Sequence, residues 1–91
     1  MTGDRTAEER NIGVVMQYFA KPEVAAIQIT EGEIKVGDAL RIKGATTDFT
    51  QKIESMQIDR VPVQSAKAGQ SVGIKVKERV RDHDKVFLVI G

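Results

Sequence analysis

The sequence contains no cysteine and only one histidine among its 91 residues. Without cysteine, neither a disulfide nor a thiolate metal site can stabilise the fold, so stability must come from apolar packing and backbone pairing. No apolar run approaches the roughly 20 residues of a membrane-spanning helix, and residues 1–10 lack the apolar stretch of a signal peptide. We therefore expect a soluble, cytoplasmic protein with no membrane partner.

Residue patterns for catalysis and cofactor binding are also scarce. The phosphate-binding pattern G-x-x-x-x-G-K followed by Ser or Thr does not occur, so no GTP binding is expected. His83 lies between Asp82 and Asp84, and three consecutive residues cannot easily converge on one metal ion, so we expect a solvated loop histidine. None of the serines, Ser71 included, is expected to act as a nucleophile. The sequence predicts no catalytic residue, no metal site, no cofactor and no enzyme activity.

Short segments of alternating apolar and polar residues, separated by turn signals, cover most of the chain. They predict strands over residues 12–19, 24–29, 39–43, 47–58, 71–76 and 85–90. No segment of ten or more residues has convincing helical spacing. This pattern predicts an all-β fold, a six-stranded antiparallel Greek-key-like barrel, whose closure would remove exposed edges. Residues 1–11 are expected to form a flexible N-terminal tail, and residues 12–91 a single β-barrel domain.

Two of these strands have unusual patterns. In residues 47–58, Phe49 and Ile53 share one parity while Met56 and Ile58 share the other, which predicts a β-bulge near Glu54. Residues 85–90 are apolar at almost every position. A strand that is apolar on both faces is expected in the middle of the structure or at a closing seam.

Glycine and aspartate mark the expected turns. Gly37 and Gly69 are predicted to adopt positive φ, and Gly32 also marks a turn. Asp38 is expected to accept a hydrogen bond from its own turn backbone. Gly73 lies inside a strand, which suggests a kink or a close backbone approach.

The order of these signals resembles the second domain of translational GTPases such as elongation factor Tu. The resemblance runs from about Gly13 to Val89 and includes Gly13-Val14-Val15, the turn Ile34-Lys35-Val36-Gly37-Asp38, and Gly69 with Gly73. It implies the β-barrel fold of translation proteins and a stand-alone, elongation-factor-like protein. It also implies a non-catalytic module whose partners are ribosomal RNA, transfer RNA or ribonucleoprotein.

A second resemblance leads to a different function. Some collagenase-like peptidases carry a C-terminal barrel with a Val-Gly-Asp turn and a Phe-x-Gln strand, here Val36-Gly37-Asp38 and Phe49-Thr50-Gln51. Such barrels are accessory modules. The alternative prediction is therefore a protein-docking domain for a separately encoded partner, such as a peptidase or a GTPase.

Basic residues supply the candidate binding surface. Lys75, Lys77, Arg79 and Arg81 occupy successive odd positions, so in an extended strand they would share one face at a spacing of about 6.6 Å. Arg41 and Lys43 alternate in the same way and could extend the patch. This arrangement predicts contacts to an RNA backbone. An ordinary solvated face and a surface for an acidic protein remain the alternatives, because lysine on an outer strand face also prevents edge pairing.

Overall fold

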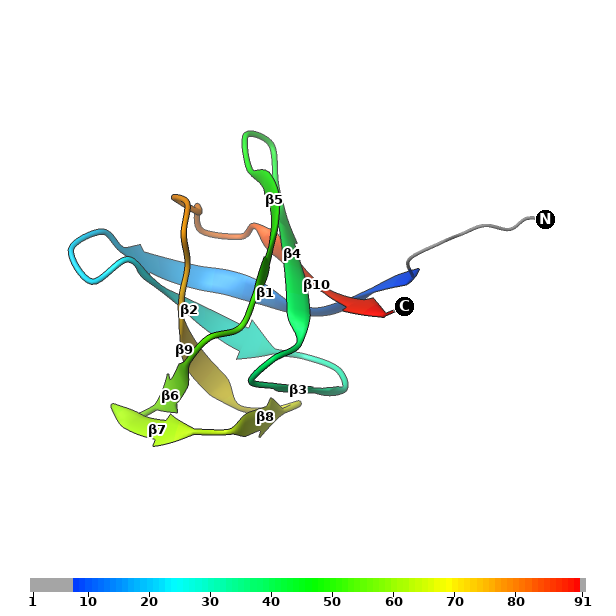
Figure 1. Ribbon diagram of the computed structural model, residues 1–91. Helices are drawn as coiled ribbons and strands as arrows, with labels where there is room; N and C mark the ends of the chain where they lie inside the picture. The colour runs from blue at the N-terminus through cyan, green and yellow to red at the C-terminus, as the bar shows by residue number, and fades with distance from the viewer. Residues whose placement is uncertain (1–7, 91) are drawn as a thin grey trace.

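The computed structural model describes residues 8–90, which form ten β-strands and no helix (Figure 1). The strands are β1 (Glu8–Phe19), β2 (Val24–Ile29), β3 (Glu33–Lys35), β4 (Ala39–Lys43), β5 (Asp48–Lys52), β6 (Met56–Ile58), β7 (Val61–Val63), β8 (Ser65–Lys67), β9 (Ser71–Lys75) and β10 (Lys85–Ile90). Eight of them form one sheet in the order β5-β4-β10-β1-β2-β9-β6-β7, while β3 pairs with β8. Every pairing is antiparallel.

The alternation of side chains decides which face of each strand enters the core. Along β2, Ala25, Ile27 and Ile29 are fully buried, and the residues between them are half-buried on the other face. β-branched residues favour this geometry because they pack well on a pleated surface. Full burial of an isoleucine side chain stabilises the folded state by about 1.5–3 kcal/mol. These positions form one core with the inward residues of β1, β4 and β9.

The apolar strand β10 lies inside the sheet, as its composition predicts. It pairs with β1 on one side and with β4 on the other. Val86 is fully buried, while Phe87, Leu88 and Val89 are half-buried. The prediction of a central position for residues 85–90 is therefore confirmed.

Residues 47–58 form two strands with different partners. β5 pairs with β4 through Lys52, and after Lys52 the chain turns away to form β6, which pairs with β9 and β7. Phe49, Ile53 and Met56 are all buried, so the shift in parity coincides with this change of partner and not with a bulge in one strand. Residues 61–63 and 65–67 form the short strands β7 and β8.

The predicted antiparallel all-β fold is confirmed, whereas the closed six-stranded barrel is wrong. The eight-stranded sheet ends at β5 on one side and at β7 on the other, and no strand within residues 8–90 pairs with either outer edge. The sheet curls, but backbone pairing does not complete the circle (Figure 1). In the described part of the chain, no helix is long and apolar enough to cross a membrane.

The first strand begins earlier than the sequence pattern indicates. β1 starts at Glu8, and its first residues pair with the end of β10, with Glu9 opposite Val89 and Asn11 opposite Phe87. Residues 8–11, expected in the tail, are therefore part of the sheet. The rest of the predicted tail, residues 1–7, lies outside the described residues.

The glycines predicted at turns adopt positive φ angles. Gly32, Gly37 and Gly69 have φ angles of 69°, 100° and 95°, in the left-handed region that glycine adopts without strain. The carboxylate of Asp38 accepts a hydrogen bond of 3.0 Å from the Lys35 backbone N–H. A Cβ atom on Gly73 would lie 3.3 Å from Val24 Cγ1, so the neighbouring side chain packs directly over this backbone.

Candidate functional site

The four basic residues after position 74 do not share a strand. β9 ends at Lys75, and Lys77, Arg79 and Arg81 follow in the loop that leads to β10. All four side chains are exposed. Because β9 ends at Lys75, the four residues do not have the regular spacing of about 6.6 Å expected along one strand face.

The loop after β9 is held against β1. Val80 is buried, and the backbone N–H of His83 donates to the Val15 carbonyl at 2.8 Å. The Val15 N–H in turn donates to the carbonyl of Asp84, also at 2.8 Å. The Asp84 carboxylate is buried and accepts a hydrogen bond from the Arg81 N–H at 2.9 Å. The basic loop is therefore a fixed part of the fold.

Arg41 is neutralised by two carboxylates. Its guanidinium donates to Asp48 at 2.8 and 2.9 Å and to Glu9 at 2.9 and 3.2 Å, which joins β1, β4 and β5 across the outer face of the sheet. The hydrogen bonds that Arg41 donates to Asp48 and Glu9 raise the pKa of Arg41 above its usual value, and the same guanidinium lowers the pKa of Asp48. Arg41 therefore offers little free charge to a ligand.

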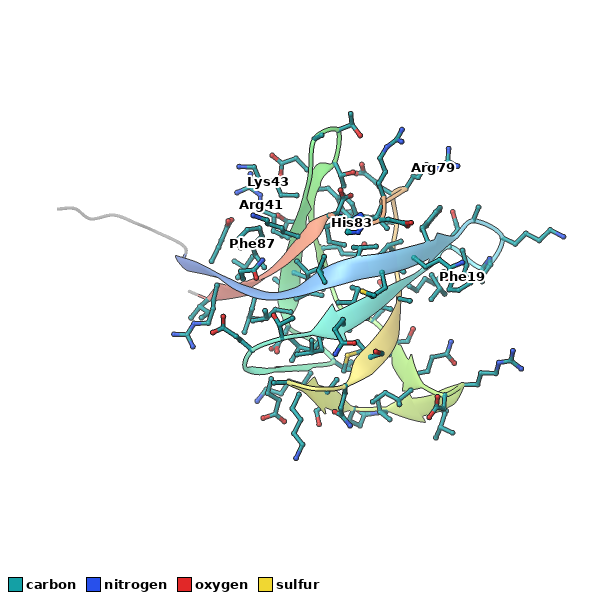
Figure 2. The ribbon with its side chains drawn as sticks, turned by 180° about the vertical axis from the view of Figure 1, so that it is seen from behind. Phe19, Arg41, Lys43, Arg79, His83 and Phe87 are labelled. Carbon is teal, nitrogen blue, oxygen red and sulfur yellow. The ribbon has the colours of Figure 1, made fainter. Side chains whose placement is uncertain are left out.

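Lys43 lies on β4 and not on the loop that carries Arg79 and Arg81. It is directly opposite Lys85 and lines a pocket with Phe87 and with His83 of that loop. Figure 2 shows Arg41 and Lys43 beside Phe87, with Arg79 on the loop after β9. The structure does not join Arg41 and Lys43 to the other four residues in one cationic stripe.

A seam separates β5 from β9 where the curled sheet fails to close. The register with β4, together with the bonds of Thr47 and Ile53, places the backbone groups of Asp48, Thr50 and Lys52 on the outer edge of β5. The register with β2 likewise turns the backbone groups of Lys75 away from β2, and the Lys77 N–H faces the same side. Two backbone edges thus face the seam.

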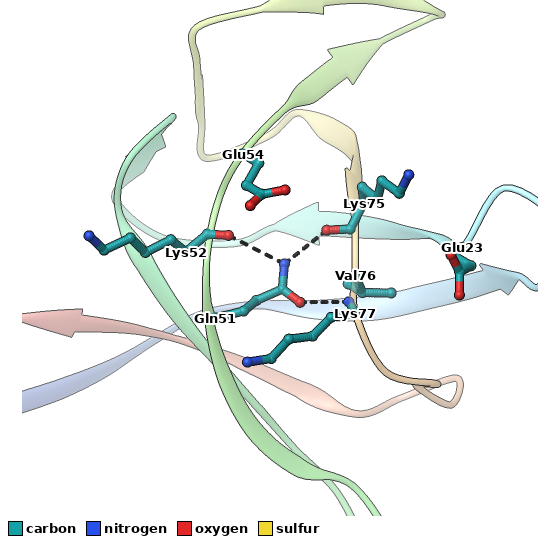
Figure 3. Close-up of a pocket in the computed structure, with 7 residues that line it drawn as sticks. All are labelled: Glu23, Gln51, Lys52, Glu54, Lys75, Val76 and Lys77. Atoms are coloured by element: carbon teal, nitrogen blue, oxygen red, sulfur yellow. Dashed lines mark hydrogen bonds between the residues drawn. The ribbon is translucent and has the colours of Figure 1, made fainter.

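The side-chain amide of Gln51 bridges this seam. Its Nε2 donates to the Lys75 carbonyl at 2.8 Å, and its Oε1 accepts from the Lys77 backbone N–H at 2.9 Å (Figure 3). Nε2 also lies 3.4 Å from the Lys52 carbonyl, a longer and weaker contact. One primary amide therefore satisfies a carbonyl and an N–H that no strand pairs among residues 8–90.

A cavity of about 410 Å³ lies along the seam beside Gln51. Its charged lining residues are Glu23, Lys52, Glu54, Lys75 and Lys77, all exposed. The lining carries three positive and two negative charges, so a small positive excess remains. Val76 is buried and supplies apolar contact in the cavity wall.

Charge patterning alone selected Lys75 and Lys77 but missed Gln51. Leu40 lies opposite Gln51 and is buried, so the glutamine points toward the core side between Phe49 and Ile53. The available signal was a single amide side chain on the strand face that otherwise carries the apolar residues Phe49 and Ile53. The Phe-x-Gln pattern draws attention to the residue but does not indicate its partner.

Ser71 lies in Gly69-Gln70-Ser71-Val72-Gly73, which has the G-x-S-x-G spacing of nucleophile elbows. That motif needs a strained turn from a strand into a helix, whereas Ser71 is the first residue of strand β9. Its Oγ donates to Gln28 Oε1 at 2.8 Å. Among residues 8–90, no group of three or more His, Cys, Asp or Glu side chains could hold a metal ion.

No protein-family model matches the chain. Among curated proteins, it is 37% identical over 84 residues to a collagenase of Porphyromonas gingivalis, covering 91% of this chain and 23% of the relative. It is 38% identical over 79 residues to an uncharacterized protease of Methanocaldococcus jannaschii, covering 86% of this chain and 19% of that protease. The chain thus spans about a fifth of the length of these relatives.

The fold matches a domain of known structure. The C-terminal domain of a protein assigned to the U32 peptidases in Geobacillus thermoleovorans superposes with a TM-score of 0.80 at 23% identity. The alignment covers 87% of this chain and 91% of that domain. A selenomethionine variant of the same domain gives a TM-score of 0.79 at 24% identity. The chain therefore has the fold of this C-terminal domain.

These comparisons correct the first assignment made from the sequence. The resemblance to the second domain of elongation factor Tu is wrong, because the relatives and structural neighbours are proteins of the collagenase and U32 peptidase type. The translation-linked function and the RNA or ribonucleoprotein partners are withdrawn with it. The second resemblance, to the C-terminal domain of collagenase-like peptidases, agrees with both comparisons.

Proposed function

We propose that the chain is a non-catalytic accessory domain of the U32 peptidase type, which acts by docking on a peptidase partner. The observation that carries this proposal is the 37% identity to a collagenase over 91% of this chain but only 23% of the collagenase. A segment of that share is the size of one domain within a larger enzyme. The chain corresponds to that one domain.

The described residues support a docking role more than a catalytic one. Ser71, the serine of the G-x-S-x-G spacing, bonds to Gln28 on another strand and not to a histidine. Most of the molecule is a curled sheet around an apolar core, and a cavity of about 410 Å³ lies beside a backbone edge at Gln51. A rigid sheet with an open edge is well suited to binding another polypeptide.

The test uses the intact chain as bait and as enzyme. The immobilised protein is exposed to nuclease-treated lysate of its own cells, and retained proteins are identified by mass spectrometry. Retention of a peptidase supports the proposal, whereas retention of ribosomal proteins or of no protein contradicts it. In parallel, the purified chain is incubated with fluorescent gelatin. We expect no cleavage by the chain alone, and turnover would make it an enzyme.

A further inference from the structure

We propose that the seam between β5 and β9 binds an extended peptide segment of the partner by strand addition. This deepens the proposed function and rests on it, because it names the surface through which the domain would hold a peptidase partner. The occupant is one stretch of partner chain that lies between the two backbone edges. In that position it would complete the barrel that this chain leaves open.

The backbone on both sides of the seam is oriented toward the gap. Asp48, Thr50 and Lys52 present their N–H and C=O groups along the outer edge of β5. Lys75 presents its backbone groups from the opposite side, and Lys77 presents its N–H there. An extended segment placed between them finds hydrogen-bonding groups on both of its own edges, as a central strand does.

Gln51 already occupies the position of a peptide group in the seam. Its amide carries one donor and one acceptor in use, at 2.8 and 2.9 Å from the Lys75 carbonyl and the Lys77 N–H. A backbone peptide group offers the same pair of functions. The seam therefore binds an amide in the present structure, and a peptide backbone is the ligand class with matching chemistry.

The gap between β5 and β9 is wider than one strand spacing. A whole glutamine side chain and a hydrogen bond separate the β5 backbone from that of Lys75, which exceeds the single strand spacing of about 4.8 Å. An inserted strand requires two such spacings, about 9.6 Å between the flanking backbones. The cavity of about 410 Å³ beside Gln51 provides space for side chains of the incoming segment.

The other edge of the sheet is closed to the same interaction. Gln57 directs its backbone to β9, so Pro62 opposite it directs its own backbone outward, where proline has no N–H to donate. The Gln64 carbonyl already accepts a hydrogen bond of 2.9 Å from Val36. Of the two outer edges, only that of β5 is therefore free of such protection.

The charges around the seam favour an acidic segment. Lys52, Lys75 and Lys77 outnumber Glu23 and Glu54, and every one of these side chains is exposed at the cavity. Glutamates on one face of an extended peptide would find lysines on both sides of the seam. The lysines selected from the sequence thus acquire a protein ligand in place of RNA.

The experiment measures binding of a capped octapeptide of alternating threonine and glutamate by NMR titration of the intact protein. We expect saturable shifts at the amides of Thr50 and Lys77. A copy of the peptide with N-methylated backbone should lose binding at least tenfold, because it cannot donate to the seam. A threonine and lysine peptide should bind more weakly than the acidic one.

Variants locate the site. Gln51→Ala removes the competing amide, so the acidic peptide should bind about five- to tenfold more tightly. Gln28→Ala, a matched glutamine that bonds Ser71 away from the seam, should leave affinity unchanged. If Gln51→Ala unfolds, Gln51→Glu serves instead. Its carboxylate cannot donate to the Lys75 carbonyl and repels the acidic peptide, so this variant should bind the acidic peptide more weakly than wild type.

Four outcomes would overturn the inference. These are no saturable binding, equal binding of the N-methylated peptide, shifts remote from Thr50 and Lys77, and no response to Gln51→Ala. Dimerisation of the chain that Gln51→Ala strengthens would make a second copy the occupant and would also overturn it. Capture of a peptidase by both wild type and a seam variant that cannot bind peptide would contradict the seam while leaving the proposed function intact.

Discussion

Two regions of this small sheet are closed by different means. From β4 through β10, β1 and β2 to β9, backbone ladders join every neighbouring pair of strands, and the side chains beneath them are fully buried. Between β5 and β9, one glutamine side chain replaces a whole ladder. The continuous region is held by many backbone hydrogen bonds, whereas the seam depends on a single side-chain amide.

The largest effect is expected in the continuous region. Ile27 is fully buried on β2, so Ile27→Ala leaves a cavity and should lower the free energy of unfolding by about 2–5 kcal/mol. For a domain of this size the melting temperature should fall by at least about 8 °C. Ile90→Ala, at an isoleucine that is 41% exposed, is the control and should cost far less. Equal losses in the two variants would contradict the contrast between core and surface.

The second prediction concerns the seam itself. Gln51→Ala leaves the Lys75 carbonyl and the Lys77 N–H without their protein partner, but water can reach both. We expect a loss of about 1–2 kcal/mol by chemical denaturation. Hydrogen exchange at the Lys77 amide should accelerate, while exchange at Ile27 should change little. Unaltered protection of Lys77 would show that the Gln51 amide does not close the seam.

The third prediction tests the protected edge at β7. Pro62→Thr adds an N–H to the outer edge and a residue with high strand propensity, so weak concentration-dependent association is expected in sedimentation velocity. The free energy of unfolding should change by no more than about 0.5 kcal/mol. Pro22→Thr, in the turn between β1 and β2, is the matched control and should remain unassociated. A monomeric Pro62→Thr variant would show that proline is not what protects this edge.

The smallest effect should come from the ion pairs on the outer face. The Arg41 guanidinium lowers the pKa of Asp48 below its ordinary 3.8 in the folded state, so the Asp48 contribution to stability is present above that value. It is lost as the pH falls through the lowered pKa. Asp48→Asn should therefore be slightly less stable than wild type at neutral pH, and the difference should be smaller at an acid pH below 3.8. Denaturation curves at both pH values provide the check, and a difference that grows in acid would contradict the pairing.

The sequence predicted the strand content because its evidence is local. Alternation within β2 and β4 identifies inward residues such as Ile27 and Ile42 without knowledge of any partner strand, and both are buried. Residues 85–90, which are apolar at almost every position, similarly indicated a central position. Pairing was harder to predict, because the pattern over residues 47–58 does not say that the chain leaves β4 after Lys52 for a new partner.

The candidate site was predictable only in part. Lys75 and Lys77 stood out by charge, but the assumption of a continuing strand through Arg81 failed because β9 ends at Lys75. Arg41 appeared free in the sequence, yet it bonds to Glu9, which is 32 residues away. No local pattern reports such a contact.

By itself, the sequence determined the all-β class, the inward faces of the strands and the glycine turns, because period-two alternation and backbone φ preferences act over a few residues. Only the tertiary structure decided that the barrel stays open, that Gln51 spans the gap and that Arg41 is neutralised. The bonds from Gln51 to Lys75 and from Arg41 to Glu9 join residues 24 and 32 positions apart, and the way the whole sheet curls sets the distance between them.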